Sequence, residues 1–521
     1  MYGCPGCGSM MTFDIQGQEL KCGRCGRTES VEDADRREAR TAGNSFSVDL
    51  LTCPTCGAEI RSMNTAQAAF CSYCGASVLL ESREADMEAP ETVAPFRVTR
   101  EECFEKYRNM VRKSLCADRK LKKEVTAESF RGIYVPHYVY SAAVQGDTVL
   151  EGHETKGNDT YYYNTSVSLD HQFENILHDA SREMPDAMSE KIARVDQDAF
   201  RPFSPAYLSG FYADVPDTKE SAYIPFAKAE AVRLGLKDVM HDLEGGYSYS
   251  TAEAEKKLVK MAKAECTGHT LIPVWFMSIR SGKRLLYAIQ NGVTGEMTAD
   301  IPMDIPRFGL IALIAAIPIF LLLNFINLTL RPEMVLTVAM LLALGAQWIV
   351  NNHRGNIRDR ELAEKAKDGR DSLTRRLKQR KKLASHAKGS ITGTLQSIGG
   401  AGAMILLLAG LRGLAKLNNA KVFMLAAAVL TAAMGGLLLW GSRTKVRTPA
   451  GCFAALIVMI LGTLNLVVNP FHSDDLVMYL LSFLCMAAVV WVCVDMLALH
   501  NRACSNPMPQ FETHQGGEDN A

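Results

Sequence analysis

Hydrophobic and polar residues divide this chain of 521 residues into three successive regions. Residues 1–80 are mostly polar and contain only short apolar stretches. Residues 96–304 mix periodic apolar positions typical of both helices and strands. From residue 308 onward, long apolar runs dominate. The pattern predicts a multidomain protein whose first half is soluble in character and whose second half is a membrane domain.

Residues 96–304 have the pattern of a compact α+β domain. Apolar residues recur at steps of three and four from Phe104 to Leu115, which predicts an amphipathic helix over 101–116. Strands are predicted where β-branched and aromatic residues gather. The same reasoning predicts helices over 220–243 and 251–266, strands over 131–140, 148–150 and 160–169, and a hairpin over 271–297.

Six apolar stretches in the second half approach the length of about 20 residues that a membrane-spanning helix needs. They predict an all-α polytopic membrane domain over 305–500, followed by a tail over 501–521. The six stretches are 308–330, 334–350, 391–411, 421–440, 450–469 and 476–499.

Basic residues predict the orientation of these spans. The loop over 351–388 holds 13 Lys and Arg against 5 Asp and Glu, a net charge of +8. Such a loop faces the cytoplasm, and two preceding spans then place the N-terminal half in the cytoplasm as well. Arg412, Lys416 and Lys421 would face the other side, so a five-span arrangement remains an alternative.

The end of the basic loop is a candidate contact for anionic lipid headgroups or for a partner. Each basic residue near such a surface contributes roughly 1 kcal/mol. The simpler interpretation is that the charge sets topology and does nothing more. The residues concerned are Arg375, Arg376, Lys378, Arg380, Lys381 and Lys382.

Eight of the fifteen cysteines form two copies of one pattern, which reads CxxC, fourteen residues, CxxC. Two intervening residues let both sulfurs of a pair face one point, and a Gly after the second Cys suits a backbone with φ > 0. The pattern predicts two structural Cys4 sites for Zn²⁺, while iron in a rubredoxin-like site uses the same spacing. Disulfides are disfavoured in reducing cytosol. The predicted ligands are Cys4, Cys7, Cys22, Cys25, Cys53, Cys56, Cys71 and Cys74.

Four thiolates fill a tetrahedral zinc and leave no position for substrate. A segment of about 30 residues cannot bury a core alone, so the metal supplies much of its folding energy. The predicted organisation is zinc ribbons over 1–30 and 51–80, a linker over 31–50, and a second, acidic and Pro-containing linker over 81–95.

The sequence shows no catalytic constellation, which predicts that the protein is not an enzyme. No metalloprotease, nucleophile-elbow, phosphate-loop or dinucleotide motif occurs. His171 and His178 lie seven residues apart, as on one helix face, but no acidic pair completes a site. The remaining cysteines are interpreted as small buried hydrophobic residues. They are Cys103, Cys116, Cys266, Cys452, Cys485, Cys493 and Cys504.

Charge favours a protein partner over nucleic acid for the cysteine-rich region. Residues 1–80 hold seven basic and nine acidic residues, a net charge of −2. Two zinc ions with four thiolates each would bring this to about −6. Nucleic-acid binding needs a basic face, which only a local patch at Arg24 and Arg27 offers.

Four motifs of the middle region, together with the paired cysteine knuckles, resemble bacterial membrane proteins of the TFIIB-type zinc ribbon-containing kind. The resemblance covers residues 1–304 and implies no catalytic residue. It implies a bacterial cytoplasmic membrane location, and relatives in phage-shock-like operons help recruit a PspA-type coat protein. The motifs are YVPHYVY at 134–140, AYLSGFYAD at 206–214, LIPVWFM at 271–277 and YAIQNGVTGEM at 287–297.

These features together predict a non-enzymatic membrane adaptor that binds a soluble cytoplasmic protein, in the setting of a membrane-stress response. A regulated transport or export component is the second reading. Two others are a membrane-tethered zinc-ribbon protein that binds nucleic acid, and a membrane enzyme.

Overall fold

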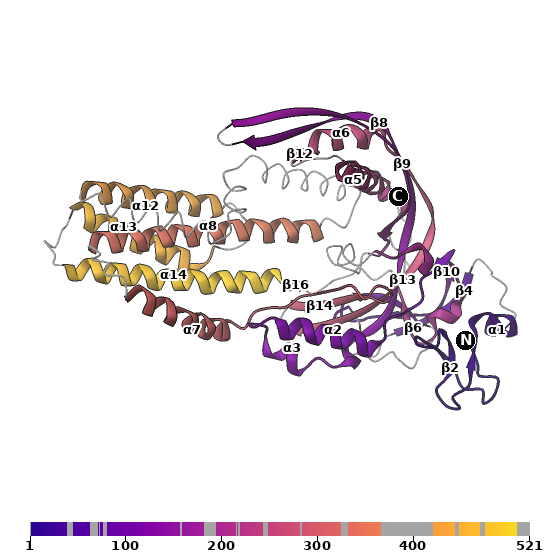
Figure 1. The fold of residues 1–521 in the computed structure, drawn as a ribbon. Coiled ribbons are helices and arrows are strands. Elements are labelled where there is room, and N and C mark those ends of the chain that lie inside the picture. The colour runs from indigo at the N-terminus through magenta and orange to yellow at the C-terminus, as the bar shows by residue number, and fades with distance from the viewer. Residues whose placement is uncertain are drawn as a thin grey trace, which may run out of the picture. The chain divides into compact units, whose positions relative to one another are not determined.

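The computed structural model divides into two compact units (Figure 1). Unit 1 comprises Met1–Lys113, Lys122–Asp300 and Asn506–Ala521, and unit 2 comprises Ser114–Leu121 and Ile301–Ser505. The structure describes residues 2–38, 45–62, 71, 73–76, 81–156, 159–181, 194–214, 216, 219–242, 248–281, 284–324, 332–365, 420–442, 448–468 and 475–507.

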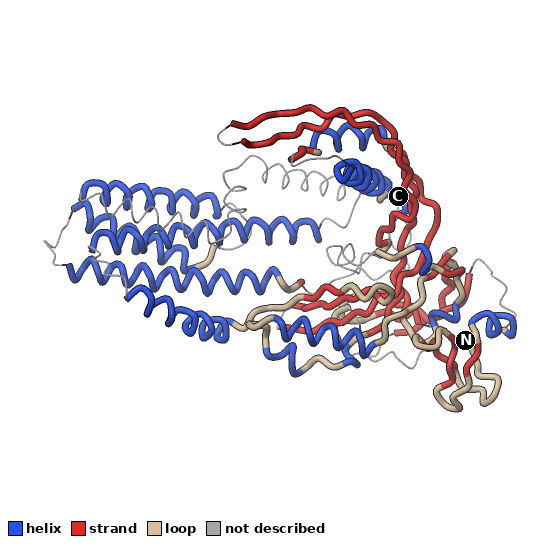
Figure 2. Tube along the Cα trace, viewed as in Figure 1, coloured by secondary structure: helices blue, strands red, loops and turns tan. Residues whose placement is uncertain are grey.

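Unit 1 is rich in strands (Figure 2), which form one small and one large sheet within the described residues. The small sheet is antiparallel and contains β1 (Met11–Asp14), β2 (Glu19–Cys22) and β3 (Thr28–Glu29). The thirteen strands of the large sheet are β4 (Ser45–Thr52), β5 (Glu59–Ser62), β6 (Glu81–Glu88), β7 (Thr92–Val93), β8 (Arg131–Lys156), β9 (Asp159–Asp179), β10 (Arg201–Pro202), β11 (Tyr212–Ala213), β12 (Ser248–Ser250), β13 (Lys263–Ser281), β14 (Arg284–Asn291), β15 (Met297–Ala299) and β16 (Asn506–Pro507).

The main path of the large sheet runs β10-β7-β13-β8-β11-β5-β4-β6. Strand β8 is its longest member and pairs antiparallel with β13, β9 and β12. The strands predicted over 131–140 and 148–150 are therefore one strand, because β8 continues to pair with β9 through the intervening residues. The hairpin predicted over 271–297 is present as β13 and β14, from Val274↔Asn291 to Ser281↔Arg284.

The predicted helices of the middle region are present with corrected ends, and those expected over 101–116 and 220–243 extend over Arg100–Lys113 and Ile224–Asp242. The helix expected over 251–266 stops at Met261, and the chain enters β13 at Lys263. Residues Lys263 to Cys266 pair with β8, so strand pairing overrides their helical composition. The helices of unit 1 are α1 (Val31–Arg37), α2 (Arg100–Lys113), α5 (Ile224–Asp242), α6 (Ala252–Met261) and the 3-10 helices η2 (Ala127–Ser129), η3 (Gln197–Ala199), η4 (Pro205–Leu208) and η5 (Glu220–Ala222), while α3 (Arg119–Lys123) spans the boundary between the units.

The two predicted linkers contain regular structure. The segment 31–50 holds α1 and the first part of β4, and the segment 81–95 holds β6 and β7. Strand β6 pairs with β4 along its whole length, from Ser45↔Glu88 to Thr52↔Glu81. The acidic composition of this segment predicted a linker. The same composition suits β6, because β6 lies at one end of the sheet path and charged side chains there discourage further strand pairing.

A cluster of aromatic rings fixes the centre of unit 1. Phe96 stacks on Phe211 with ring centroids 4.4 Å apart, and it contacts Trp275 at 4.9 Å and Tyr134 at 5.3 Å. The backbone at Gly132 lies so close that an added Cβ would be 2.5 Å from the ring of Phe211. The packing of the cluster thus requires glycine at this position of β8.

Unit 2 is helical and contains α7 (Ile305–Asn324), α8 (Pro332–Lys365), α12 (Ala420–Ser442), α13 (Ala450–Val468) and α14 (Asp475–Ala503). Among the described residues, three helices are long and apolar enough to cross a membrane: Pro332–Gly355, Ala450–Val468 and Asp475–Ala503.

The described part of the chain thus supports three of the six predicted spans. The spans predicted over 308–330 and 421–440 correspond to α7 and α12, which contain the apolar stretches Ile305–Pro318 and Met424–Leu439. The span predicted over 391–411 lies outside the described residues, and so does the basic cluster from Arg375 to Lys382.

The helices of unit 2 carry apolar side chains on both their inner and outer faces. Met340, Ala343 and Met459 are fully buried in a shared core. Leu313 and Phe483 are about two-thirds exposed, at 65% and 69%. Extended apolar surface of this kind is unfavourable in water, and it matches an apolar environment. Unit 2 is therefore suited to association with a membrane.

Replacing Gly132 with Ala tests the aromatic cluster. The added methyl group must displace the ring of Phe211, so the free energy of unfolding should fall by about 1–3 kcal/mol. The control is Gly23→Ala, because nothing lies within 4 Å of a Cβ at Gly23. Denaturant unfolding of the detergent-solubilised protein, followed by tryptophan fluorescence, measures both. Equal stability of the two variants would contradict the packing.

Candidate metal centres

The four CxxC turns share one backbone conformation. In each, the amide of the following Gly donates to the carbonyl of the first Cys, over 2.8–3.0 Å. The first Cys in turn donates its amide to the carbonyl five residues later, as Cys4 does to Ser9 at 2.8 Å. As predicted, each Gly has positive φ, which only glycine adopts without strain. The values are +72° at Gly8, +73° at Gly26, +81° at Gly57 and +65° at Gly75.

These turns bring the eight predicted ligands into two groups of four sulfurs. The first Cys4 group is Cys4, Cys7, Cys22 and Cys25, and the second Cys4 group is Cys53, Cys56, Cys71 and Cys74. Within each group, all four sulfurs lie within 4.8 Å of one another.

The sulfur separations fit a tetrahedral metal ion. Cys4 and Cys7 lie 3.5 Å from Cys25 and Cys22, respectively. In the second group the closest separations are 3.8 Å and 3.7 Å. Four sulfurs at about 2.3 Å from one ion would be about 3.8 Å apart, whereas a disulfide would bring two of them to about 2.05 Å. All eight thiols are free, so both groups can hold a metal ion.

The two groups differ in exposure. In the first, Cys4 and Cys22 are buried while Cys7 and Cys25 are exposed. In the second, all four cysteines are buried. They belong to one apolar cluster with residues of β8, β13 and β14, including Ile133, Phe276 and Ile289. Repeats of identical spacing therefore occupy different environments.

Hydrogen bonds fasten the second Cys4 group to the large sheet. The guanidinium Nε of Arg280 donates to the carbonyl of Cys74 at 2.9 Å. The hydroxyl of Tyr287 donates to the carbonyl of Tyr73 at 3.2 Å. Strand β5, which follows the first knuckle of this group, pairs with β11. The second ribbon is thus part of the large sheet and its core.

The first ribbon contacts the rest of unit 1 through both ends of its small sheet. The amide of Phe13 donates to the carbonyl of Ser209 at 2.9 Å, and the Phe13 ring packs edge-on against Tyr207 at 5.3 Å. At the other end of the small sheet, the side chain of Gln18 donates to the carbonyl of Phe96 at 2.7 Å.

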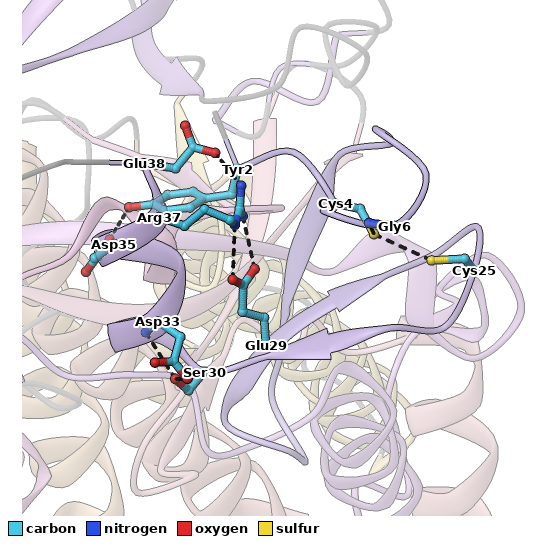
Figure 3. Close-up of polar contacts among 10 residues, drawn as sticks. All are labelled: Tyr2, Cys4, Gly6, Cys25, Glu29, Ser30, Asp33, Asp35, Arg37 and Glu38. Atoms are coloured by element: carbon cyan, nitrogen blue, oxygen red, sulfur yellow. Dashed lines mark hydrogen bonds and ion pairs between the residues drawn. The ribbon is translucent and has the colours of Figure 1, made fainter.

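Helix α1 braces the first ribbon from one side (Figure 3). The guanidinium of Arg37 donates twice to the carboxylate of Glu29, at 3.0 Å each, which joins α1 to β3. The hydroxyl of Tyr2 donates to Asp35, and Asp35 also accepts from Ser204. The sulfurs of Cys4 and Cys25 face one another beyond these contacts.

Electrostatics in both groups favour a bound cation. Hydrogen bonds from Cys56 and Cys71 lower the pKa of Cys74 to about 2, and contacts with Cys56 and Cys74 together with burial raise the pKa of Cys71. One thiolate in this buried group therefore opposes ionisation of the next. In the first group, the backbone amide and hydroxyl of Ser9 lower the pKa of Cys7 to about 6. A divalent cation would let all four thiols ionise.

The remaining candidates are placed as follows. His171 and His178 lie on strand β9, not on a helix, and the ring of His178 stacks on Tyr223 at 3.8 Å. Cys103, Cys452 and Cys485 are buried, whereas Cys116, Cys266, Cys493 and Cys504 are partly exposed.

Sequence reasoning missed a third group, in which Cys266 and His269 approach Glu220. Its sequence signal is the CxxH spacing of Cys266 and His269, which falls between the end of the helix predicted over 251–266 and the hairpin predicted over 271–297.

The different burial of the two Cys4 groups predicts different consequences of losing a ligand. Cys71→Ser should lower the melting temperature of unit 1 by about 6–20 °C, since breaking a buried charged network costs about 3–5 kcal/mol, at roughly 2–4 °C per kcal/mol. Cys25→Ser, at an exposed ligand of the first group, should lower it by much less. Thermal unfolding and metal analysis of each variant test this prediction. Similar decreases in melting temperature for the two variants would contradict a core role for the second Cys4 group.

Comparison with known proteins adds one relative. The chain is 25% identical over 312 residues to the uncharacterised protein YdjG of Bacillus subtilis (strain 168), and the aligned region covers 58% of this chain and 90% of YdjG. No family model matches the chain, and no solved structure matches it.

Proposed function

We propose that this protein is a bacterial membrane adaptor whose zinc ribbons and α+β domain bind a soluble protein partner in the cytoplasm. The observation that carries the proposal is the exposure of the first ribbon. Residues 5–8 and 23–28, which form the tips of both its knuckles, are exposed. The cysteines of the second ribbon are buried in the core of the large sheet, whereas both knuckles of the first ribbon are open to a partner.

The ligand sets support a structural role for the metal ions. Four cysteine sulfurs saturate a tetrahedral zinc, so neither Cys4 group offers a position for substrate. The metal ions would hold the knuckles in place, and binding would use the polypeptide surface around them. This chemistry suits an adaptor better than an enzyme.

A contact of Arg27 supports a protein partner over nucleic acid. A Cβ added to Gly6 would lie 3.2 Å from Nε of Arg27, so this guanidinium lies over the knuckle of Cys4 and Cys7. Its charge there offsets that of the metal-bound thiolates, which leaves Arg24 as the remaining basic residue of the CGRCGR segment. One arginine is a poor phosphate-binding face. A PspA-type coat protein is the partner that the sequence resemblance favours.

The membrane half of the proposal keeps six spans with the N-terminus in the cytoplasm. The three long apolar helices support membrane anchoring. The segment predicted as a loop over 351–388 begins as the last part of α8, through Lys365, and its net charge of +8 supports a cytoplasmic position. Its basic end would lie near anionic headgroups and strengthen attachment.

A second candidate, a transport component, is favoured by one buried side chain. Gln347 on α8 is fully buried, and neither its amide nitrogen nor its amide oxygen has a partner among the described residues. Uncompensated polar groups at membrane depth often mark a substrate path. The adaptor remains the favoured function, because Gln347 is the single residue that supports transport.

Charge reversal at the exposed knuckle tests the adaptor. Arg24→Glu should weaken capture of the partner at least tenfold, equivalent to about 1.4 kcal/mol. Thr55→Glu is the matched control, because Thr55 is exposed and holds the same place in the CxxC turn of the buried ribbon. Cross-linking in cells, purification of the full-length protein and mass spectrometry identify the captured proteins. Recovery of nucleic acid without protein, or equal capture by both variants, would reject the proposal.

Reporter fusions test the proposed topology. Six spans with a cytoplasmic N-terminus also place residues 501–521 in the cytoplasm. Green fluorescent protein fused after Ala521 should therefore fluoresce, and alkaline phosphatase fused at the same place should be inactive. The five-span alternative predicts the reverse for both reporters.

A further inference from the structure

A third group of metal-ligating side chains lies on unit 1, apart from the two Cys4 groups. It comprises Cys266 and His269 of β13 and Glu220 at the start of η5. One ligand atom from each lies within 4.8 Å of the other two. Cys266 and His269 are partly exposed and Glu220 is exposed, so an ion can reach the group from solvent.

A β-bulge creates this grouping. Residues three apart on a regular strand point to opposite faces of the sheet. In β13, however, Cys266 pairs with Tyr140, Gly268 with Val139 and His269 with Tyr138, so Thr267 is an extra residue. Because Tyr138 and Tyr140 share a face of β8, the bulge places Cys266 and His269 on one face as well.

Contacts outside the three ligands hold two of them in position. The hydroxyl of Tyr140 donates to the backbone carbonyl of Glu220 at 2.6 Å, which fixes the start of η5 against the sheet. The ring of Tyr138 packs edge-on against the ring of His269 at 5.0 Å. The carboxylate of Glu91 accepts from the amide of His269. Glu91 also adds a second negative charge beside the group.

The side chains of His269 and Glu220 form an ion pair when the imidazole is protonated, and they lie close enough to share a metal ion when it is neutral. Nε2 of His269 lies 3.8 Å from Oε2 of Glu220, which is beyond hydrogen-bond range. Two ligand atoms at about 2.1 Å from a tetrahedral ion are about 3.4 Å apart, so a small side-chain movement closes the site. The mixture of thiolate, imidazole and carboxylate suits zinc and related transition metals, whereas Ca²⁺ and Mg²⁺ prefer oxygen ligands.

We propose that Cys266, His269 and Glu220 bind a zinc-type divalent cation with one coordination position left open. Three protein ligands and a fourth position for water is the arrangement of reactive or exchangeable zinc sites, in contrast to closed Cys4 sites. The inference goes beyond the adaptor function, because it places a metal ion with an accessible ligand position on the domain that follows the ribbons.

Metal titration of the full-length protein in detergent tests this site. Wild-type protein that already holds its two Cys4 ions should bind one further equivalent of Zn²⁺. With Co²⁺ as the probe, that equivalent should produce a cobalt–thiolate absorption band. Cys266→Ser should abolish the band and weaken binding at least 100-fold, and His269→Ala and Glu220→Gln should weaken binding at least tenfold. Cys116→Ser, at another partly exposed cysteine, should change nothing.

Retention of the two Cys4 ions shows that each variant is folded. Glu220→Gln alters an exposed side chain, so it remains informative if Cys266→Ser fails to fold. The proposal is overturned if saturated wild-type protein holds only two ions per chain. It is equally overturned if a third ion binds Cys266→Ser and Glu220→Gln as tightly as it binds the wild type.

Discussion

Burial of four cysteine sulfurs inside the large sheet is the constraint on which unit 1 depends. The second Cys4 group shares its apolar cluster with residues of β8, β13 and β14, including Ile133, Phe276 and Ile289. Four thiols this close cannot all ionise without a cation, because each thiolate raises the cost of the next. A metal ion would turn this repulsion into a cross-link that joins residues 53–56 and 71–74 to the centre of the sheet.

The two ribbons place one ligand pattern in two different environments. Both use the same turns, the same positive-φ glycines and similar sulfur separations. The first is held by its small sheet, by the contact of Phe13 with Tyr207 and by α1, and it leaves Cys7 and Cys25 exposed. The second contributes its knuckles to the core. This difference in burial is the basis for proposing a partner surface on the first ribbon and a structural role for the second.

The third group differs from the two Cys4 groups in the number of protein ligands it offers a metal ion. Saturated Cys4 sites hold polypeptide in place, whereas the set of Cys266, His269 and Glu220 would leave a position open. The group depends on the β-bulge in β13. Its extra residue lets Cys266 and His269, three positions apart, lie on the same face of the sheet. Regular pairing before and after the bulge keeps that geometry fixed.

The sequence by itself determined the features that depend on local chemistry. Repeated CxxC spacing identified all eight sulfurs, and apolar periodicity located α2 and α5, because turns and amphipathic faces are set by residues close in the chain. Tertiary structure decided what depends on distant partners. The acidic segment 81–88 forms strand β6 because it pairs with β4. Residues Lys263 to Cys266, which were predicted to be helical, pair with β8 instead. Cys266 lies close to Glu220, although 46 positions separate them in the chain. Packing also decided that the cysteines of the second ribbon are buried while Cys7 and Cys25 of the first are exposed. The identical spacing of the cysteines could not predict this difference.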